Sequence, residues 1–324
     1  MRNLLIHEAT FARIAEDLKA RSDDVATYVL YNDGQIRDVA GNVLEDTRGL
    51  TIGYGTPDVW FSAAGPPFMS AILGVNRLEW FQASAAGTEH PVLRSLIEKA
   101  ERYTGSHVQS EAIAEWVLWA GLDWLQKGQA RRAAQANKVW GRIPFSEIAR
   151  THWLIIGFGA IGQATARRLR ALGATVTGVR RTPGSHELAD EMIGPEAVLE
   201  ATGRADVVLL CTPHTEETEG MANAAFFAAM KSTAMLVNVG RGMLVDEAAL
   251  VHALDSGEID HASLDVTATE PLPEDSPIWT HPKITLTAHL SADTMGTAHR
   301  SDALFLDNLD RLLSGAPLRN LVTD

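Results

Sequence analysis

Residues 153–172 contain, in order, an apolar run, a glycine-rich turn and an amphipathic stretch. The run Trp153–Phe158 (WLIIGF) is typical of a buried strand, and the stretch from Ile161 to Leu172 has apolar side chains at helical spacing. Gly173 stands where a glycine commonly ends a helix. A strand that leads through a glycine turn into a helix is part of a βαβ unit. The feature therefore predicts an α/β fold with a parallel sheet.

The glycines of this turn have the spacing GxGxxG, which is weak evidence alone but specific between a strand and a helix. We expect Gly157 to make the tight turn, Gly159 to let the backbone approach a pyrophosphate, and Gly162 to let helix and strand pack closely. The helix N-terminus then offers N–H groups to the phosphates. The cofactor contacts predicted from this turn and from the end of a later strand are Gly157, Gly159, Ala160, Ile161, Gly162, Thr212 and Pro213.

The end of the next predicted strand, Thr175–Val179, indicates which dinucleotide binds. A free ribose 2′-OH usually meets an acidic residue at this place. Here the strand is followed by Arg180, Arg181 and Thr182, and two guanidinium groups beside a hydroxyl suit a 2′-phosphate. We therefore expect NADP to be preferred, with NAD as the second option. The alternative interpretation is that the two arginines form a solvated surface pair.

Short apolar runs alternate with amphipathic stretches along most of the chain, as expected for βα units. Further strands are predicted at 26–31, 50–54, 78–83, 206–213, 234–240, 261–266 and 284–290. Long helices are predicted over 107–127 and 292–313. A chain of 324 residues is long enough for two domains. We expect a dinucleotide-binding domain at 106–290 and a second, discontinuous domain made of 1–105 and 291–324.

The composition excludes several other classes of protein. A formal net charge of −13 and a pI near 5.3 disfavour nucleic acid and anionic membranes as partners. The single cysteine, Cys211, excludes an internal disulfide and a cysteine-rich metal site, and no metal is expected. No apolar stretch reaches the roughly 18 residues of a membrane span, and the N-terminus does not resemble a signal peptide. We therefore expect a cytoplasmic protein.

Three residues with the chemistry of a reductase follow the ends of later strands. Arg241 stands in a glycine turn after one strand, Glu270 follows the next, and His289 ends the last. An arginine can bind a carboxylate and polarise a carbonyl, and a histidine can donate a proton to the alkoxide that develops. A neighbouring carboxylate would orient the histidine. Each residue alone has an ordinary interpretation, as a surface or loop residue, but their shared position at strand ends favours a catalytic group.

Four motifs in this order resemble the D-isomer-specific 2-hydroxyacid dehydrogenases. They are GFGAIG at 157–162, VNVGRG at 237–242, LDV with EPLP at 264–273, and TAHLS at 287–291. The resemblance implies that Arg241 binds the substrate and that Glu270 pairs with His289. It implies hydride transfer from NAD(P)H to a small 2-oxo acid such as glyoxylate or hydroxypyruvate, which gives the D-2-hydroxy acid.

The resemblance also implies an architecture and further contacts. Both domains would be Rossmann-like, doubly wound parallel sheets, and the discontinuous first one would be flavodoxin-like and bind the substrate. The backbone of Ala86 and Gly87 would hold the substrate carboxylate, and Asp265 would meet the nicotinamide carboxamide. The helical region at 107–140 would form a homodimer, which would give its tryptophans a role. Otherwise these tryptophans are core residues.

The chain departs from the family pattern at two places. Arg180 resembles the NADPH-using glyoxylate and hydroxypyruvate reductase branch rather than the NAD-using members. Leu290-Ser291-Ala292 follows the histidine where many members have a glycine, which puts the shape of the substrate in question. Trp60 and Phe61 are either pocket residues or ordinary core aromatics.

Two alternative functions stay open at this point. A formate or phosphite dehydrogenase can use the same scaffold, but formate oxidation needs no carboxylate-tuned proton donor, so Glu270 counts against it. A non-catalytic, corepressor-like protein that senses NAD(P) is the other alternative. The absence of an acidic residue after Val179 counts mildly against an NADH sensor.

Overall fold

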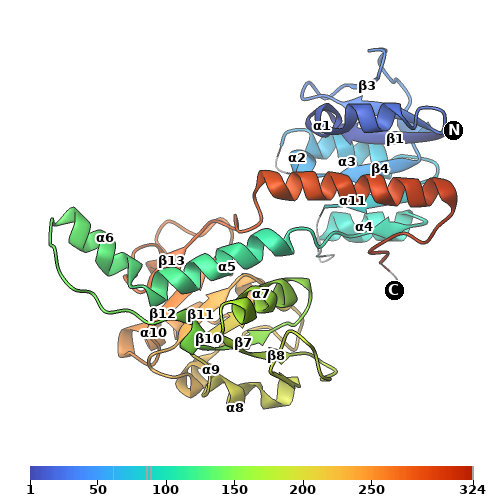
Figure 1. Cartoon of the computed structure of the whole chain (residues 1–324). Coiled ribbons are helices and arrows are strands. Elements are labelled where there is room, and N and C mark those ends of the chain that lie inside the picture. Colours follow the sequence, from blue (N-terminus) through green and yellow to red (C-terminus); the bar gives the residue numbers. More distant parts are fainter. Residues whose placement is uncertain (61, 85–86, 88–89, 323–324) are drawn as a thin grey trace. The chain divides into compact units, whose positions relative to one another are not determined.

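The computed structural model describes residues 1–60, 62–84, 87 and 90–322. The chain divides into two compact units (Figure 1). Unit 1 comprises Met1–Gln109 and Thr294–Asp324, and unit 2 comprises Ser110–Asp293. The domain boundaries predicted from the sequence, at residues 105–106 and 290–291, lie a few residues before the boundaries in the structure.

Unit 2 contains a seven-stranded sheet in the order β13-β12-β11-β10-β7-β8-β9. All of the pairings between these strands in the described residues are parallel. The order reverses between β7 and β10, and an open α/β sheet binds its ligands at such a switch point. The strands are β7 (His152–Ile156), β8 (Thr175–Val179), β9 (Glu191–Ile193), β10 (Val207–Leu210), β11 (Met235–Asn238), β12 (His261–Leu264) and β13 (Ile284–Leu286).

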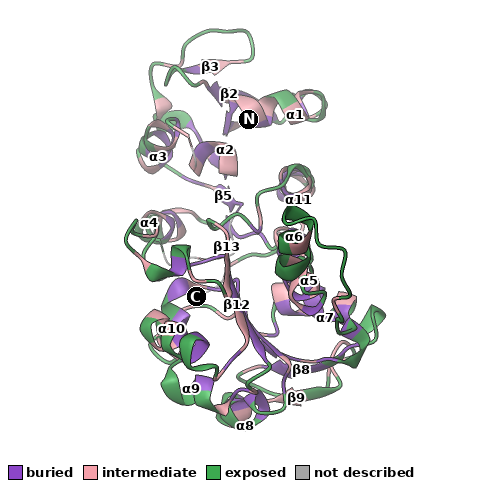
Figure 2. Cartoon of the chain, turned by 90° about the vertical axis from the view of Figure 1, so that its left-hand side faces the viewer, coloured by how far each residue is buried: buried purple, intermediate pink, exposed green. Residues whose placement is uncertain are grey.

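Helices cover both faces of this sheet because its central strands are apolar on both sides. One face packs against α5 (Ser110–Leu125) and α7 (Ala160–Ala171). The other packs against α8 (Val198–Thr202), α9 (Ala224–Ala229) and α10 (Glu247–Ser256). The central strands are buried and the outer helix faces are exposed (Figure 2). The helix α6 (Gly128–Ala136) contains no buried residue.

Unit 1 contains a six-stranded sheet in the order β3-β2-β1-β4-β5-β6. Among the strands that the structure describes, only the edge strand β3 is antiparallel, and the other five follow the order of the flavodoxin-like fold. The strands are β1 (Arg2–His7), β2 (Val25–Leu30), β3 (Ile36–Asp38), β4 (Ile52–Gly55), β5 (Trp80–Ala83) and β6 (Tyr103–Thr104).

The helices of unit 1 come from both ends of the chain. One face of the sheet packs against α2 (Pro57–Trp60), α3 (Gly65–Leu73) and α4 (Pro91–Lys99). The other packs against α1 (Glu8–Lys19) and α11 (Met295–Ser314), whose Phe305 stacks on Tyr54 and Trp80. This return of the C-terminal helix makes unit 1 discontinuous, as expected.

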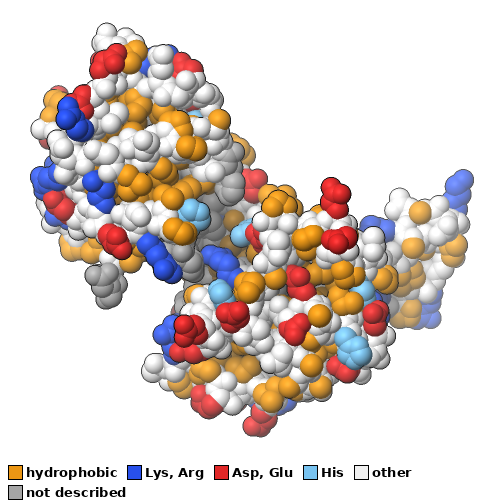
Figure 3. All heavy atoms as spheres, turned by 180° about the vertical axis from the view of Figure 1, so that it is seen from behind, with side chains coloured by type: hydrophobic (Ala, Val, Ile, Leu, Met, Phe, Trp, Pro, Cys, Tyr) orange, Lys and Arg blue, Asp and Glu red, His pale blue; other side chains and the backbone are white. Residues whose placement is uncertain are grey.

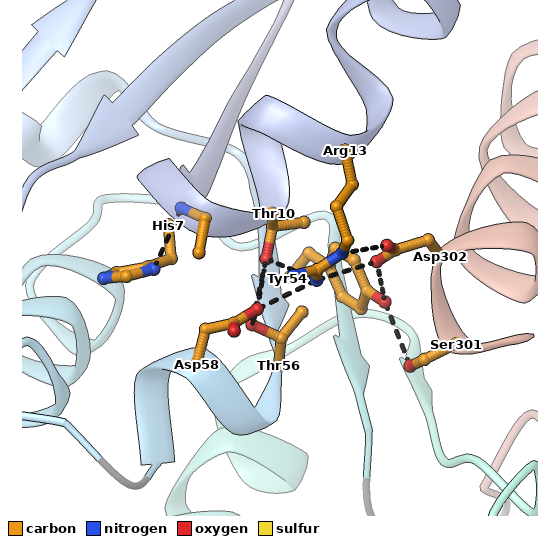
Figure 4. A network of polar contacts seen from close by, with 9 residues as sticks. His7, Thr10, Arg13, Tyr54, Thr56, Asp58, Ser301 and Asp302 are labelled. Atoms are coloured by element: carbon orange, nitrogen blue, oxygen red, sulfur yellow. Dashed lines mark hydrogen bonds and ion pairs between the residues drawn. The ribbon is translucent and has the colours of Figure 1, made fainter. Parts of the chain in front are cut away.

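A polar network joins these elements inside unit 1 (Figure 4). Arg13 on α1 donates from Nε to Asp302 Oδ2 on α11 at 2.6 Å and from Nη2 to Asp58 Oδ2 on α2 at 2.8 Å. The hydroxyl of Tyr54 on β4 donates to Asp302 Oδ1 at 3.0 Å. The network therefore fixes α2 and α11 relative to the central strands, since one guanidinium serves two carboxylates.

The predicted fold class is confirmed: both units are doubly wound α/β sheets. The sequence missed β1, β3, β6 and β9. No element was predicted for the first residues, yet Leu4, Leu5 and Ile6 are fully buried in the centre of the unit 1 sheet. The last helix begins at Met295 rather than 292, because Thr294 accepts from the N–H of Thr297 and caps it there.

The surface mixes charges of both signs. Acidic and basic side chains are interspersed on the face drawn in Figure 3 rather than separated by sign. Within the described residues, no helix is both long enough and apolar enough to span a membrane.

Candidate active site

The glycine turn after β7 has the geometry that its spacing predicted. Gly157 has a φ of +102°, and a Cβ there would lie 2.6 Å from the backbone of Cys211 and Thr212. A Cβ on Gly162 would lie 2.5 Å from the carbonyl oxygen of Gly157. Both positions therefore require glycine, one for a left-handed turn and one for the close contact between α7 and β7.

Gly159 is different, because a Cβ there would meet no atom within 4 Å. It is the N-cap of α7, where no side chain caps the helix, and both Gly159 and Ala160 are exposed. The first N–H groups of a helix have no carbonyl partner within the helix, and they attract anions. The residues present therefore fit a pyrophosphate at this turn.

Arg180 lies beside the same turn. It follows β8, is half-buried, and donates from Nε to the carbonyl oxygen of Phe158 at 3.2 Å. Arg181 and Thr182 follow and are exposed. Thr212 and Pro213 follow β10, the strand next to β7. The structure thus gathers the predicted cofactor residues at the carboxyl edge of one sheet.

The single cysteine lies against this turn. Cys211 Sγ donates to the carbonyl oxygen of Gly157 at 3.0 Å. Desolvation by burial raises the pKa of the Cys211 thiol to about 12. The group is therefore a neutral thiol at neutral pH and contributes packing rather than a nucleophile.

The three residues with reductase chemistry follow three neighbouring strands. Arg241 comes after β11, Glu270 after β12 and His289 after β13, and these strands lie side by side in the sheet. Their carboxyl ends share one edge, because all three strands are parallel. The three residues are far apart along the chain, and the neighbouring strands of the sheet bring them to one edge.

Two glycines shape the turn that holds Arg241. A Cβ on Gly240 would lie 2.9 Å from the carbonyl oxygen of Thr212, and one on Gly242 would lie 1.9 Å from the carbonyl carbon of Thr267. Asn238 Nδ2 donates to the carbonyl oxygen of Arg241 at 2.9 Å. The turn therefore packs directly on the backbone that follows β12.

Glu270 joins that backbone to the histidine. Its Oε1 accepts from the N–H of Thr267 at 3.1 Å, and its Oε2 lies 2.8 Å from Nδ1 of His289. A carboxylate only accepts, so Nδ1 of His289 donates and Nε2 is left for another partner. The side chain of His289 is 52% exposed, so the ring is oriented by Glu270 and still accessible.

Asp265 holds the turn that presents His289. Its side chain is buried, and its Oδ1 accepts from Thr287 Oγ1 at 2.6 Å and from the N–H of Leu290 at 2.9 Å. Both carboxylate oxygens lie 3.2 Å from the N–H of Ser291, whose hydroxyl also donates to Oδ2. His289 itself has a φ of +56°. The family resemblance implied that Asp265 contacts the nicotinamide carboxamide. Nothing in the sequence indicated that its carboxylate also fixes the turn.

The substrate-binding loop predicted in unit 1 is only partly described. Ala86 and Phe61 lie outside the described residues. Gly87 is half-buried and belongs to no helix or strand. Trp60 ends α2 and packs against the apolar core of unit 1. Among the residues that the structure describes, no group of three or more His, Cys, Asp or Glu side chains could hold a metal ion.

A Rossmann sheet with a glycine turn and a histidine paired with a glutamate is typical of oxidoreductases that use a nicotinamide cofactor. Comparison with known proteins identifies the family. Residues 118–291 match the NAD-binding domain of D-isomer specific 2-hydroxyacid dehydrogenases. The chain therefore belongs to the D-isomer-specific 2-hydroxyacid dehydrogenase family, as its motifs suggested.

Among curated proteins, the chain is similar to a glyoxylate/hydroxypyruvate reductase B of Citrobacter koseri. The two are 40% identical over 234 residues, which cover 71% of this chain and 63% of that reductase. The match thus spans less than two thirds of the reductase.

Two solved structures are similar over almost the whole chain. A family member from Aeromonas salmonicida has a TM-score of 0.79 and 26% identity, and 99% of each chain is covered. An NADPH-dependent glyoxylate/hydroxypyruvate reductase from Sinorhizobium meliloti, solved with NADP and sulfate, has a TM-score of 0.75 and 25% identity. That alignment covers 99% of this chain and 98% of the other.

Proposed function

We propose that this protein reduces a small 2-oxo acid, such as glyoxylate or hydroxypyruvate, to the D-2-hydroxy acid, with NADPH as the preferred cofactor. The observation that carries the proposal is the 2.8 Å contact of Glu270 Oε2 with His289 Nδ1, beside the packed Arg241 turn. The family and the named reductases among its relatives support it.

Each residue of the group has a chemical task. The planar guanidinium of Arg241 binds the substrate carboxylate and draws electron density from the 2-oxo oxygen. His289 gives the proton on Nε2 to that oxygen as it becomes an alkoxide. Glu270 accepts from Nδ1, which fixes the ring orientation and stabilises the protonated ring. When bound, the reduced nicotinamide supplies the hydride that the 2-oxo carbon receives.

The preference for NADPH rests on the residues after β8. The strand leads directly into Arg180, whose Nε is tied to the glycine turn. Its remaining guanidinium N–H groups have no partner among the described residues, so they can donate to a ligand. Arg181 and Thr182 add a second guanidinium and a hydroxyl on the exposed side. No acidic side chain occurs among these three residues to accept from a ribose 2′-OH.

The first experiment follows the absorbance of the reduced nicotinamide. NADPH and NADH are each supplied with glyoxylate, hydroxypyruvate, pyruvate and phenylpyruvate. We expect oxidation of NADPH with at least one small 2-oxo acid and a lower kcat/KM with NADH. Cofactor binding without oxidation for any acid would reject the reductase and favour the sensor.

We also propose that the protein forms a homodimer through α5 and the segment that follows it. The exposed side of α5 carries Trp119, which packs beside Trp116 with ring centroids 5.8 Å apart. Together with Leu172, which follows α7, it lines a mostly apolar surface hollow of about 790 Å³. Beyond it, α6 and the residues to 147 remain largely exposed. Such a surface is typical of a subunit interface.

A further inference from the structure

The turn that carries His289 is built around one buried carboxylate. We call residues 287–291 the histidine turn, which follows β13 within unit 2. Asp265, which follows β12 and is only 1% exposed, accepts from four donors of this turn. They are the Thr287 hydroxyl, the Leu290 N–H, and the N–H and hydroxyl of Ser291. A carboxylate has about four acceptor sites, so the histidine turn alone fills them.

Two of the four donors are hydroxyl groups, and they hold opposite oxygens of the carboxylate. Thr287 Oγ1 donates to Oδ1 at 2.6 Å, and Ser291 Oγ donates to Oδ2. Hydrogen bonds to a charged acceptor are stronger than bonds between neutral groups. Because Ser291 is also buried, loss of its hydroxyl leaves an acceptor of Asp265 unsatisfied rather than open to solvent. The buried carboxylate therefore depends on these two side chains.

The backbone of His289 depends on the carboxylate in turn. His289 has a φ of +56°, in the left-handed region that residues other than glycine rarely adopt. Such a conformation persists where the surrounding contacts fix it. The His289 N–H donates to the main-chain oxygen of Asp265 at 2.7 Å, and the N–H groups of the next two residues donate to its side chain. Consecutive N–H groups in such a turn form a concave anion site, and the Asp265 carboxylate is the anion that occupies it.

The orientation of the His289 ring follows from this turn, because packing does not hold the ring. Its side chain is 52% exposed, and its Nδ1 lies 2.8 Å from Glu270 Oε2. Glu270 accepts from the N–H of Thr267, which stands two residues after Asp265 in the same loop. Asp265 therefore joins the backbone that carries the histidine to the loop that carries its carboxylate partner.

We propose that the hydroxyls of Thr287 and Ser291 are positioning groups for the proton donor. By filling the Asp265 carboxylate, they hold His289 in its left-handed conformation and so keep Nδ1 on Glu270. The proposal rests on the proposed function, in which His289 is the proton donor. Each hydroxyl acts through Asp265 and not on the substrate. Ser291 is one of the residues at which the chain departs from the family pattern, and the histidine turn gives it a specific task.

The test removes one hydroxyl at a time. Ser291→Ala and Thr287→Val each delete a donor to Asp265 with little change in side-chain size, and Thr287→Ser keeps the hydroxyl. Thr285→Val is the matched control, because the Thr285 hydroxyl lies on β13 but contacts His261 Nε2 at 3.0 Å instead of Asp265. Urea unfolding checks that each variant is folded. Each deletion is a test on its own, so one folded deletion variant is sufficient.

The first measurement needs neither cofactor nor substrate. The nitrogen chemical shifts of the imidazole rings, in isotope-labelled protein at a pH where the rings are neutral, report which nitrogen carries the proton. The His289 signals are assigned by their loss in His289→Ala. We expect the Nδ1–H form in the unaltered protein, Thr287→Ser and Thr285→Val, because Glu270 accepts from Nδ1. In Ser291→Ala and Thr287→Val we expect a mixture of both forms, as for a histidine that is free in water.

The second measurement is steady-state kinetics with NADPH and the 2-oxo acid that is reduced fastest. A misoriented proton donor weakens the transition state rather than substrate binding. We therefore expect kcat to fall about 10-fold in both deletion variants, while KM changes less than about 3-fold. Thr287→Ser and Thr285→Val should keep kcat within about 3-fold of the unaltered protein.

The Nδ1–H form in both deletion variants would overturn the proposal, whatever their kcat. A loss of kcat in Thr287→Ser equal to that in Thr287→Val would also overturn it, since the hydroxyl is then not the group that matters. If the unaltered protein reduces no 2-oxo acid, the proposed function fails. The nitrogen shifts then decide alone whether the two hydroxyls orient His289.

Discussion

At the scale of single residues, the contact of Glu270 with His289 makes the sharpest prediction. His289→Ala removes the proton donor and should lower kcat by about 10²-fold or more. Glu270→Gln keeps the size of the side chain but replaces the carboxylate that orients Nδ1, so it should lower kcat less and shift the pH profile.

Initial rates at saturating substrate, measured from pH 5 to 9, check both variants. Cofactor titration by fluorescence is the control and should give the same affinity as for the unaltered protein. Near-normal turnover of His289→Ala would refute its role as the proton donor.

Arg180 carries a prediction about the cofactor. Arg180→Asp places a carboxylate where a 2′-phosphate is expected, so the Kd for NADPH should rise about 10- to 100-fold. The Kd for NADH should change less than about 3-fold, since NADH lacks that phosphate. Binding titrations with both cofactors measure this, with the exposed Arg150→Asp as a control. Equal losses for both cofactors would assign Arg180 to the glycine turn alone.

The residues also show where prediction from the sequence ends. Gly157 and Gly162 could be predicted because their roles depend on a turn within six residues. Arg241, Glu270 and His289 could be predicted because they follow strand ends and lie in family motifs. The environment of Asp265 could not be predicted, because its donors come from residues 287–291 on the neighbouring strand and turn.

At the scale of elements, the sequence predicted long apolar strands better than short edge strands. Strands such as β10 and β11 are buried over all four residues, so they form continuous apolar runs. The edge strand β9 contains Glu191, Met192 and Ile193 and has no fully buried residue. β6 has only two residues. Pairing with a neighbour, rather than composition, makes these segments strands.

The unit formed by β7 and α7 makes a prediction that separates stability from binding. Gly162→Ala forces a Cβ against the backbone of Gly157, so the free energy of unfolding should fall by about 1–3 kcal/mol. Gly159→Ala enters open space, so it should leave stability within about 1 kcal/mol and weaken NADPH binding instead.

Urea unfolding without cofactor and fluorescence titration with NADPH measure the two effects on each variant. The pair is informative because both changes add the same methyl group within one turn of chain. Equal stability of Gly162→Ala and the unaltered protein would mean that α7 moves away from β7 at little cost.

At the scale of the whole molecule, an exposed segment follows α5. Trp140 is fully exposed, Val139 is 60% exposed and Phe145 is 51% exposed. Figure 2 shows α6 mostly exposed, with no buried residue. In Figure 1 this helix projects away from the sheet of its own unit. A segment with so little contact to its own unit gains apolar burial when a second copy covers it, which supports the proposed dimer.

Trp119→Glu should separate such a dimer, because burying an unpaired carboxylate in an apolar interface is costly. We expect the unaltered protein to sediment with twice the mass of one chain, and the variant to sediment as a monomer at micromolar concentration. Leu199→Glu is the matched control: Leu199 is 52% exposed on α8, which covers the opposite face of the unit 2 sheet, and Trp119 is 46% exposed. The control should stay dimeric. A monomeric unaltered protein, or a dimer that survives Trp119→Glu, would show that the tryptophans of α5 and the exposed segment serve another purpose.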